Sequence, residues 1–505
     1  MNRTKKFALN SFAAAINQIV IMIVGFITPR VMISTYGSEV NGLVSSLSQF
    51  ISYISLVEAG IGGAAIYSLY KPLAEKNHTQ INRIVSAARK SYLQAGYIFS
   101  SGVFVLAVIY SILCKTNALD IYQIFLLTII LGTNGCLDFF LVSGFRVLLT
   151  ADQRNYVISL AGIMQTVCRT AIICALAFFK TDVVVLYAIA LIPLIGKVLL
   201  ILFYGKRKYS FLDVKVVPDN NSLRKRWDVV YQQILGTVQT GAPTVIATLV
   251  TNLITVSVYS VYNMVMLGIN GILSIFITGL PAGFGELIAK KEIEQLKKST
   301  SEFEVAYYYM LSIVYGITFI MLLPFISIYT SGFTDANYIS ITLAIVIVLN
   351  GLLYNIKTPQ SMLIISAGMY AEMRWRVTVQ GLIIIILGTL LGFRYGIVGI
   401  LLGSCLSNLY RTIDLLLFVP KNITRRNPIE SILRIIRVFV SIAIIILPSF
   451  WLPIVAETYK VWILYAIAYG IYAVLVCTVL TLIFDKKSFV ALIKRLKIVV
   501  ERKSA

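Results

Sequence analysis

The feature that most restricts how this chain can fold is a succession of long apolar runs separated by short polar connections. A helix needs about 20 apolar residues to cross a bilayer, and the sequence holds about fourteen runs of that length. Only 13% of the residues are charged, roughly half the usual share in soluble domains, and the mean hydropathy is +0.85. The runs are continuous rather than alternating, which argues against a β-barrel. The sequence therefore predicts an all-α polytopic membrane protein.

The expected spans follow from the bounds of the runs, which fix their positions to within a few residues. They are residues 10–34, 42–70, 84–113, 121–149, 155–179, 182–204, 229–254, 258–288, 302–329, 338–366, 374–393, 397–418, 429–451 and 459–484.

The distribution of positive charge predicts how these spans are oriented. Most of the 44 lysines and arginines lie at the two ends of the chain or in alternate connections, such as the segment 204–210, "YGKRKYS". Loops rich in Lys and Arg face the cytoplasm, so both termini are expected inside, which requires an even number of spans. The net charge of +22 is thus explained by topology rather than by nucleic-acid binding. It also predicts attraction to anionic lipids of the cytoplasmic membrane.

A weak internal repeat predicts the domain organisation. Residues 60–71 align with residues 279–290, and residues 148–156 align with residues 364–372. Repeated helix bundles are typical of transporters, in which the substrate path follows the interface between the repeats. We expect two six-helix bundles related by a pseudo-twofold axis, followed by two extra helices and a basic amphipathic tail. The predicted domains are an N-terminal bundle at 1–204, a cytoplasmic linker at 205–228, a second bundle at 229–420, and the extra helices with the tail at 421–505.

One predicted span carries an acid and several glycines that do not favour membrane insertion. A carboxylate at mid-span, here Glu58, costs about 2.5 to 3.5 kcal/mol on insertion scales, and glycine weakens a helix by about 1 kcal/mol relative to alanine. Gly60 aligns with Gly279, which indicates that the fold needs a close helix contact or a bend there. We expect such packing or hinge roles at Gly60, Gly62, Gly63, Gly279 and Pro281.

Glu58 itself aligns with Ile277, so the fold does not require an acid at this position. Three roles stay open from the sequence. Glu58 can pair with a basic residue such as Arg30 or Arg169, bind a coupling proton or cation, or cap unsatisfied groups near the bend.

The segment Asn10–Ala74 resembles the opening of the polysaccharide-repeat (Wzx-type oligosaccharide-lipid) flippases of the multidrug/oligosaccharidyl-lipid/polysaccharide exporter superfamily. Tyr36 replaces the usual Leu, Glu58 replaces the commoner Asp, and Pro29 comes one residue early. Residues 394–411 resemble the twelfth span of that family. The matching positions in the opening are Asn10, Gly25, Phe26, Ile27, Pro29, Tyr36, Gly37, Gly42, Leu43, Glu58, Gly60 and Gly62.

The resemblance implies a flippase that moves a lipid-linked oligosaccharide, usually on a polyprenyl pyrophosphate, from the inner to the outer leaflet by alternating access. It implies surface polysaccharide biosynthesis, with polysaccharide assembly proteins as possible partners. The alternative is a multidrug or cation antiporter of the same superfamily, in whose lumen acids should dominate.

A membrane enzyme is disfavoured because the one histidine, His78, lies in a polar loop. The six cysteines show no paired spacing that would indicate a metal site or disulfides, and no cofactor is expected.

An anionic pyrophosphate-sugar headgroup needs a wet, cationic path, and ionisable residues inside spans are costly enough to suggest function. Arg30 and Arg146, near span ends, can alternatively snorkel to the interface, and Arg411 can pair with Asp414 in its own helix. The others have no close acid in their helices and either line the cavity or pair across helices, with Asp138 as a candidate partner. The candidate substrate-binding cations are Arg30, Arg146, Arg169, Lys197, Lys357 and Arg411.

Overall fold

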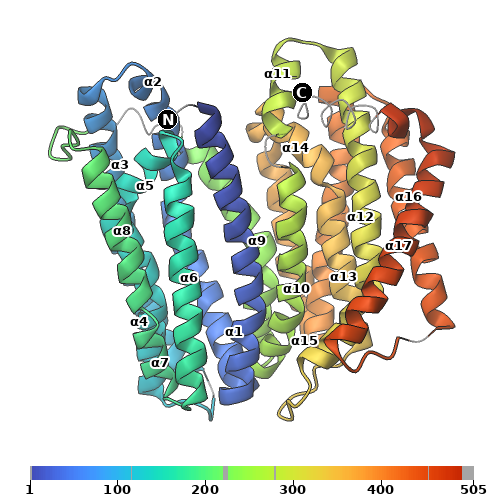
Figure 1. Ribbon diagram of the computed structural model, residues 1–505, viewed down its shortest axis with the longest axis horizontal. Helices are drawn as coiled ribbons and strands as arrows, with labels where there is room; N and C mark the ends of the chain where they lie inside the picture. Colours follow the sequence, from blue (N-terminus) through green and yellow to red (C-terminus); the bar gives the residue numbers. More distant parts are fainter. Residues whose placement is uncertain (1–2, 115, 220–225, 278–279, 453, 492–505) are drawn as a thin grey trace. The chain divides into compact units, whose positions relative to one another are not determined.

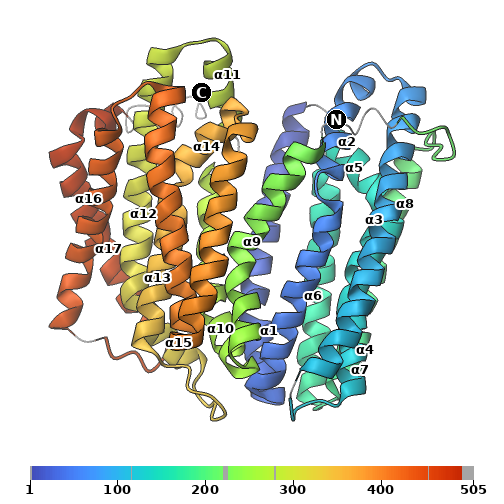
Figure 2. The same ribbon diagram turned by 180° about the vertical axis from the view of Figure 1, so that it is seen from behind.

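The computed structural model describes residues 3–114, 116–219, 226–277, 280–452 and 454–491 (Figures 1 and 2). Within these ranges the regular structure is entirely helical, and eleven helices are long and apolar enough to cross a membrane. The predicted all-α membrane fold is therefore confirmed. The chain forms two compact units, Met1–Ser260 and Val261–Ala505.

The first unit contains the helices that the sequence assigned to the first spans, together with α9 and the start of α10. Its helices are α1 (Arg3–Ile54), α2 (Ile61–Ala74), α3 (His78–Leu113), α4 (Ile121–Leu137), α5 (Ser143–Ala151), α6 (Asn155–Phe178), α7 (Val183–Ile189), α8 (Ile192–Lys208), α9 (Arg226–Val250) and α10 (Leu253–Ile277). The second unit continues with α11 (Leu280–Ala289), α12 (Ile293–Tyr329), α13 (Ile341–Ile356), α14 (Thr358–Ala367), α15 (Tyr370–Val419), α16 (Pro428–Ile446) and α17 (Tyr459–Phe484).

The two longest helices in the described part of the chain, α1 with 52 residues and α15 with 50, each contain a break at a glycine. In α1 the break is at Gly37, with φ 86° and ψ 168°, and in α15 it is at Gly396, with φ 59° and ψ −141°. Each break falls between two predicted spans. Helix α15 covers both of its spans, whereas α1 covers the span 10–34 and only the first part of the span 42–70, which continues through the turn Ser55–Glu58 into α2. The predicted number of fourteen spans and the cytoplasmic position of both termini stay predictions.

The predicted domain boundaries also stay a prediction. The compact units divide after Ser260, and this division does not test whether residues 229–420 repeat the first bundle. Gly279 and residues 492–505 of the predicted tail lie outside the described residues.

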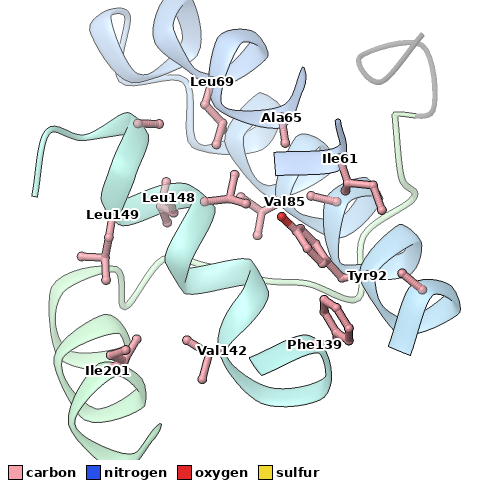
Figure 3. Packing of buried hydrophobic residues seen from close by; sticks show 14 of the residues in the cluster. Ile61, Ala65, Leu69, Val85, Tyr92, Phe139, Val142, Leu148, Leu149 and Ile201 are labelled. Carbon is pink, nitrogen blue, oxygen red and sulfur yellow. The ribbon is translucent and has the colours of Figure 1, made fainter. Parts of the chain in front are cut away.

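A packed apolar core holds α2, α3, α5 and α8 together in the first unit, as Figure 3 shows. Because lipid tails are as apolar as these side chains, close van der Waals packing rather than the hydrophobic effect holds membrane helices together. Small side chains such as Ala65, which is fully buried, allow this close packing. Tyr92 of α3 stacks on Phe139, with ring centres 6.4 Å apart. This packing fixes the start of α2 and the hydroxyl of Tyr92 beside α5.

In the second unit, α16 and α17 pack on α12. Ile445 of α16 and Tyr469, Ala473 and Cys477 of α17 join Ile320 and Met321 of α12 in one apolar cluster. The last two helices are therefore part of this compact unit.

Candidate functional site

The intramembrane carboxylate Glu58 lies at a break between helices rather than in the middle of one. A short 3₁₀ turn, Ser55–Glu58, follows α1, and Gly60 then takes a left-handed conformation with φ 76° before α2 begins. A glycine adopts such a conformation without the steric cost that a Cβ atom brings. The chain therefore changes direction directly after the acid, which turns its carboxylate toward α5.

Glu58 is paired with Arg146, which the sequence did not name as its partner. Glu58 Oε2 accepts a hydrogen bond from Arg146 Nη2 at 2.6 Å. Arg146 Nη2 also lies 3.5 Å from the hydroxyl of Tyr92, whose ring centre is 5.6 Å from the guanidinium carbon. Pairing with a basic residue is one of the three roles that the sequence left open, but the partner is Arg146 of α5 rather than Arg30 or Arg169.

The ion pair opens onto a cavity of about 320 Å³. Arg146 and Glu58 keep 30% and 26% of their side-chain surface exposed, so both charges remain accessible to a ligand. Gly62 gives the Tyr92 hydroxyl room, since a Cβ atom there would lie 2.8 Å from it, whereas a Cβ atom at Gly63 would meet nothing within 4 Å. The polar groups in the cavity wall come from Glu58, Tyr92, Arg146, Thr150, Asn155 and Gln233.

Gly60→Ala is expected to destabilise the protein by about 1 to 2 kcal/mol, because it forces a Cβ atom into a left-handed conformation. The matched control is Gly63→Ala, which adds the same methyl group to a helical residue beside open space and should leave stability equal or slightly higher. Thermal unfolding of the two purified variants in detergent measures the difference. Equal melting temperatures would contradict the role assigned to the bend.

A second ion pair joins Asp138 and Lys197. Asp138 opens a single π-helical turn, Asp138–Val142, between α4 and α5, and turns of this kind often occur at functional sites. Lys197 of α8 donates to both carboxylate oxygens at 3.2 and 3.3 Å. The lysine therefore pairs across helices, one of the two roles that the sequence left open for it.

Arg169 of α6 has a different environment. Its guanidinium carbon lies 6.0 Å from the ring centre of Tyr187, and no carboxylate among the described residues is within ion-pair distance of it. It lines a second cavity, of about 330 Å³, whose other polar groups come from Ser48, Ser52, Ser55, Asn134 and Gln165. This cavity thus offers an uncompensated positive charge among neutral hydrogen-bonding groups.

In the second unit, Lys357 lies at the junction of α13 and α14 and is buried. Its Nζ donates to Asn408 Oδ1 at 2.6 Å, and Asn408 in turn donates to Asn350 Oδ1 at 3.0 Å. Within the described ranges no carboxylate is in ion-pair distance of Lys357. The sequence prediction missed the two asparagines, although an amide inside an apolar run is a readable signal.

Arg411 pairs with Asp414 at 2.7 Å, as its local spacing indicated. Asp414 also accepts a hydrogen bond from Arg376, a contact that the sequence did not predict.

Arg30 lies within α1, one residue after Pro29, and is half-buried. Pro281 lies in the first turn of α11.

The early asparagine of the sequence motif has a structural role. Asn10 Nδ2 donates to the carbonyl of Gln153 at 2.9 Å, and the amide of Tyr156 donates to Asn10 Oδ1 at 2.8 Å. Asn10 thereby ties α1 to the turn between α5 and α6.

Asp152, in the same turn, accepts hydrogen bonds from Lys6, Arg154 and Tyr209. Burial alone raises the pKa of Asp152, but these three bonds outweigh it and lower the pKa. The carboxylate therefore stays ionised and holds the turn together at neutral pH.

No protein-family model matches the sequence, and no curated protein matches it. Several solved structures do match over most of their length. A multidrug resistance MATE family transporter of the MOP superfamily, in an inward-facing conformation, matches with a TM-score of 0.63 and 13% identity, over 85% of this chain and 98% of that one. The lipid II flippase MurJ, in an inward closed conformation, matches with a TM-score of 0.62 and 14% identity, over 95% and 99%.

A third similar structure is a MOP superfamily transporter from Pyrococcus furiosus, described as having a binding pocket of reverse polarity. It matches with a TM-score of 0.60 and 14% identity, over 85% of this chain and 98% of that one. At such identities the likeness establishes the fold and not the substrate. The chain is a multi-pass membrane protein with the fold of MOP superfamily transporters.

Proposed function

We propose that this protein is a flippase that moves a lipid-linked oligosaccharide, carried on a polyprenyl pyrophosphate, to the outer leaflet of the cytoplasmic membrane by alternating access. The observation that carries the proposal is Arg169, an intramembrane cation without a carboxylate partner among the described residues, in a cavity lined by hydroxyl and amide groups. A guanidinium binds phosphate oxygens through two parallel hydrogen bonds. Serine, asparagine and glutamine side chains suit sugar hydroxyls.

The state of the intramembrane acids supports this proposal over a multidrug or cation antiporter. Glu58, Asp138 and Asp414 each pair with an arginine or a lysine. A cationic substrate would have to displace a protein cation from one of these pairs, whereas an anionic substrate finds Arg169 available. The similarity to MurJ, a flippase for lipid II, also supports a lipid-linked substrate.

The antiporter is the second candidate, because Glu58 lines an open cavity and two of the similar structures, one inward-facing and one outward-facing, are of a multidrug resistance MATE family transporter. In that case Glu58 would exchange Arg146 for a coupling proton or a cation during the cycle.

The experiment that separates these functions is deletion of the gene, followed by mass spectrometry of the polyprenyl-linked glycans in the cytoplasmic membrane. The proposal expects one complete repeat unit to accumulate while the matching surface polymer is lost. If no lipid-linked glycan accumulates and drug sensitivity rises, the flippase proposal is wrong and the antiporter is supported.

Glu58→Gln is expected to lower transport by about tenfold, the effect of losing about 1.4 kcal/mol of favourable interaction, because Arg146 loses the contact that orients it toward the cavity. Folded yield should stay near that of the wild type, since partly exposed ion pairs contribute only about 0 to 1 kcal/mol to stability. The measurements are glycan accumulation in the complemented deletion strain and size-exclusion chromatography of the purified variant.

The exchanged pair, Glu58→Arg with Arg146→Glu, is the control for this prediction. It restores the attraction between the two positions but moves the cation from α5 to the 3₁₀ turn. If the exchange restores transport fully, then the pair acts only structurally and the positioning role of Glu58 is wrong.

A further inference from the structure

The last two helices border a cavity that the proposed function does not use. It measures about 820 Å³ and lies between the start of α16 and the end of α17, which run alongside each other in both views (Figures 1 and 2). Its apolar walls come from Leu433, Ile436, Val440, Leu480, Ile483 and Phe484. The cavity is therefore large enough and apolar enough to hold part of a lipid chain.

One end of this cavity is strongly charged. Arg434 and Arg437 of α16 meet Lys486 and Lys487, which follow α17, while Glu430 and Asp485 supply the acids. Four cations and two carboxylates thus line this end of the cavity, and Arg434 also pairs with Glu304. Both carboxylates are already engaged, because Glu430 pairs with Arg426 and Asp485 pairs with Arg434 and Arg437.

Arg437 carries a donor that the protein leaves unused. Its side chain is only 9% exposed, and Nη1 donates to Asp485 Oδ2 at 2.5 Å. Its Nη2 is buried and has no hydrogen-bond partner in the described part of the chain. A buried guanidinium nitrogen without a partner is costly, which indicates that an acceptor from outside the chain completes the site.

The two lysines, Lys486 and Lys487, are exposed and also lack an ion-pair partner in the described part of the chain. Burial alone raises the pKa of Asp485, but the hydrogen bonds and charges of the two arginines outweigh it and lower the pKa. Asp485 thus stays ionised, and its carboxylate pairs with the two arginines.

We propose that this cavity binds an anionic glycerophospholipid, with its phosphate at Arg437, Lys486 and Lys487 and one acyl chain along the apolar walls. Basic pockets between membrane helices bind such headgroups, and the apolar walls distinguish this site from one for free phosphate. The proposal is independent of the transported substrate.

The test uses the full chain, purified in detergent, with native mass spectrometry and thermal unfolding as readouts. Three probes are compared: phosphatidylglycerol, phosphatidylcholine and inorganic phosphate. We expect phosphatidylglycerol to remain bound and to raise the melting temperature, with much smaller effects of the other two. Equal stabilisation by inorganic phosphate would identify a free-phosphate site, and equal retention of phosphatidylcholine would show that charge does not select the lipid. Either result overturns the proposal.

Two variants localise the effect. The double variant Lys486→Gln with Lys487→Gln breaks no ion pair and should weaken phosphatidylglycerol retention by about tenfold or more. Arg437→Lys keeps the charge opposite Asp485 but removes Nη2, and should also weaken retention.

The matched control is Lys290→Gln with Lys291→Gln, which removes two exposed lysines from the turn that follows α11. Among the described residues, Lys290 forms an ion pair with Glu286, and both side chains are exposed. The same loss of lipid in this control would overturn the proposal, because it would show a general effect of net charge.

Discussion

Arg169→Ala is expected to lower transport of the lipid-linked glycan by at least about tenfold, which corresponds to about 1.4 kcal/mol, while folded yield stays near that of the wild type. The substitution breaks no ion pair with a described residue. Its contact with the ring of Tyr187, at 6.0 Å, is worth about 0.5 to 1 kcal/mol. A large functional effect with a small structural one is therefore the signature of a cation that binds substrate.

The measurement is accumulation of the lipid-linked glycan in the deletion strain complemented with each variant, corrected for folded protein by size-exclusion chromatography. Arg169→Lys should retain part of the activity, because a lysine keeps the charge but not the two-bond geometry of a guanidinium. The matched control is Arg394→Ala, which removes an arginine that also lies over a tyrosine ring, at 5.4 Å from Tyr395, but is exposed. If both alanine variants behave alike, Arg169 has no specific role in transport.

The sequence predicted the helical fold well because long apolar runs leave little choice of structure in a membrane. Even the breaks inside α1 and α15 fall at glycines between predicted spans, Gly37 and Gly396. The pair of Arg411 and Asp414 could likewise be anticipated, since residues three apart on a helix are neighbours. These features all depend on local sequence.

The partner of Glu58 could not be predicted in this way. Arg146 is 88 residues away in the chain, and the contact depends on how α2 packs against α5. The π-helical turn Asp138–Val142 also shifts the helical register directly before Arg146, so the face that this arginine presents does not follow from a regular period of 3.6 residues. Packing between helices, rather than periodicity, determines which charges meet.

A buried charge network around Glu304 was missed for a related reason. Its acid, Glu304, and one of its bases, Arg434, lie in different predicted spans, and each alone resembles a residue near a span end. The structure brings them together, with Arg434 Nη1 at 2.8 Å from Glu304 Oε2. This network leads to the largest expected effect on stability.

Glu304→Gln is expected to destabilise the protein by about 3 kcal/mol, the lower end of the range for removing one member of a buried ion pair. The side chain of Glu304 is only 2% exposed. The lower value applies because, after the substitution, Arg434 still forms an ion pair with Asp485 and Arg426 still forms one with Glu430. The carboxylate of Glu304 accepts hydrogen bonds from four side chains, those of Gln360, Arg426, Ser431 and Arg434.

The matched control is Glu294→Gln on the same helix, whose carboxylate is 87% exposed and pairs with Lys297. It should change stability by no more than about 0.5 kcal/mol. Thermal unfolding of both variants in detergent provides the comparison, and similar melting temperatures would contradict the assigned role of Glu304.

The double variant Glu304→Gln with Arg434→Met tests the cause of this loss. If an uncompensated buried charge is responsible, removing the arginine should recover part of the stability, because a buried ion pair replaced by neutral side chains often costs little. Arg434→Met alone frees Asp485 from one of its two arginines and should be destabilising on its own. The coupling between the two substitutions, measured as the departure from additivity, should be about 1 to 3 kcal/mol. Additive losses would instead mean that packing around Glu304, and not its charge, stabilises the junction of α12 with α16.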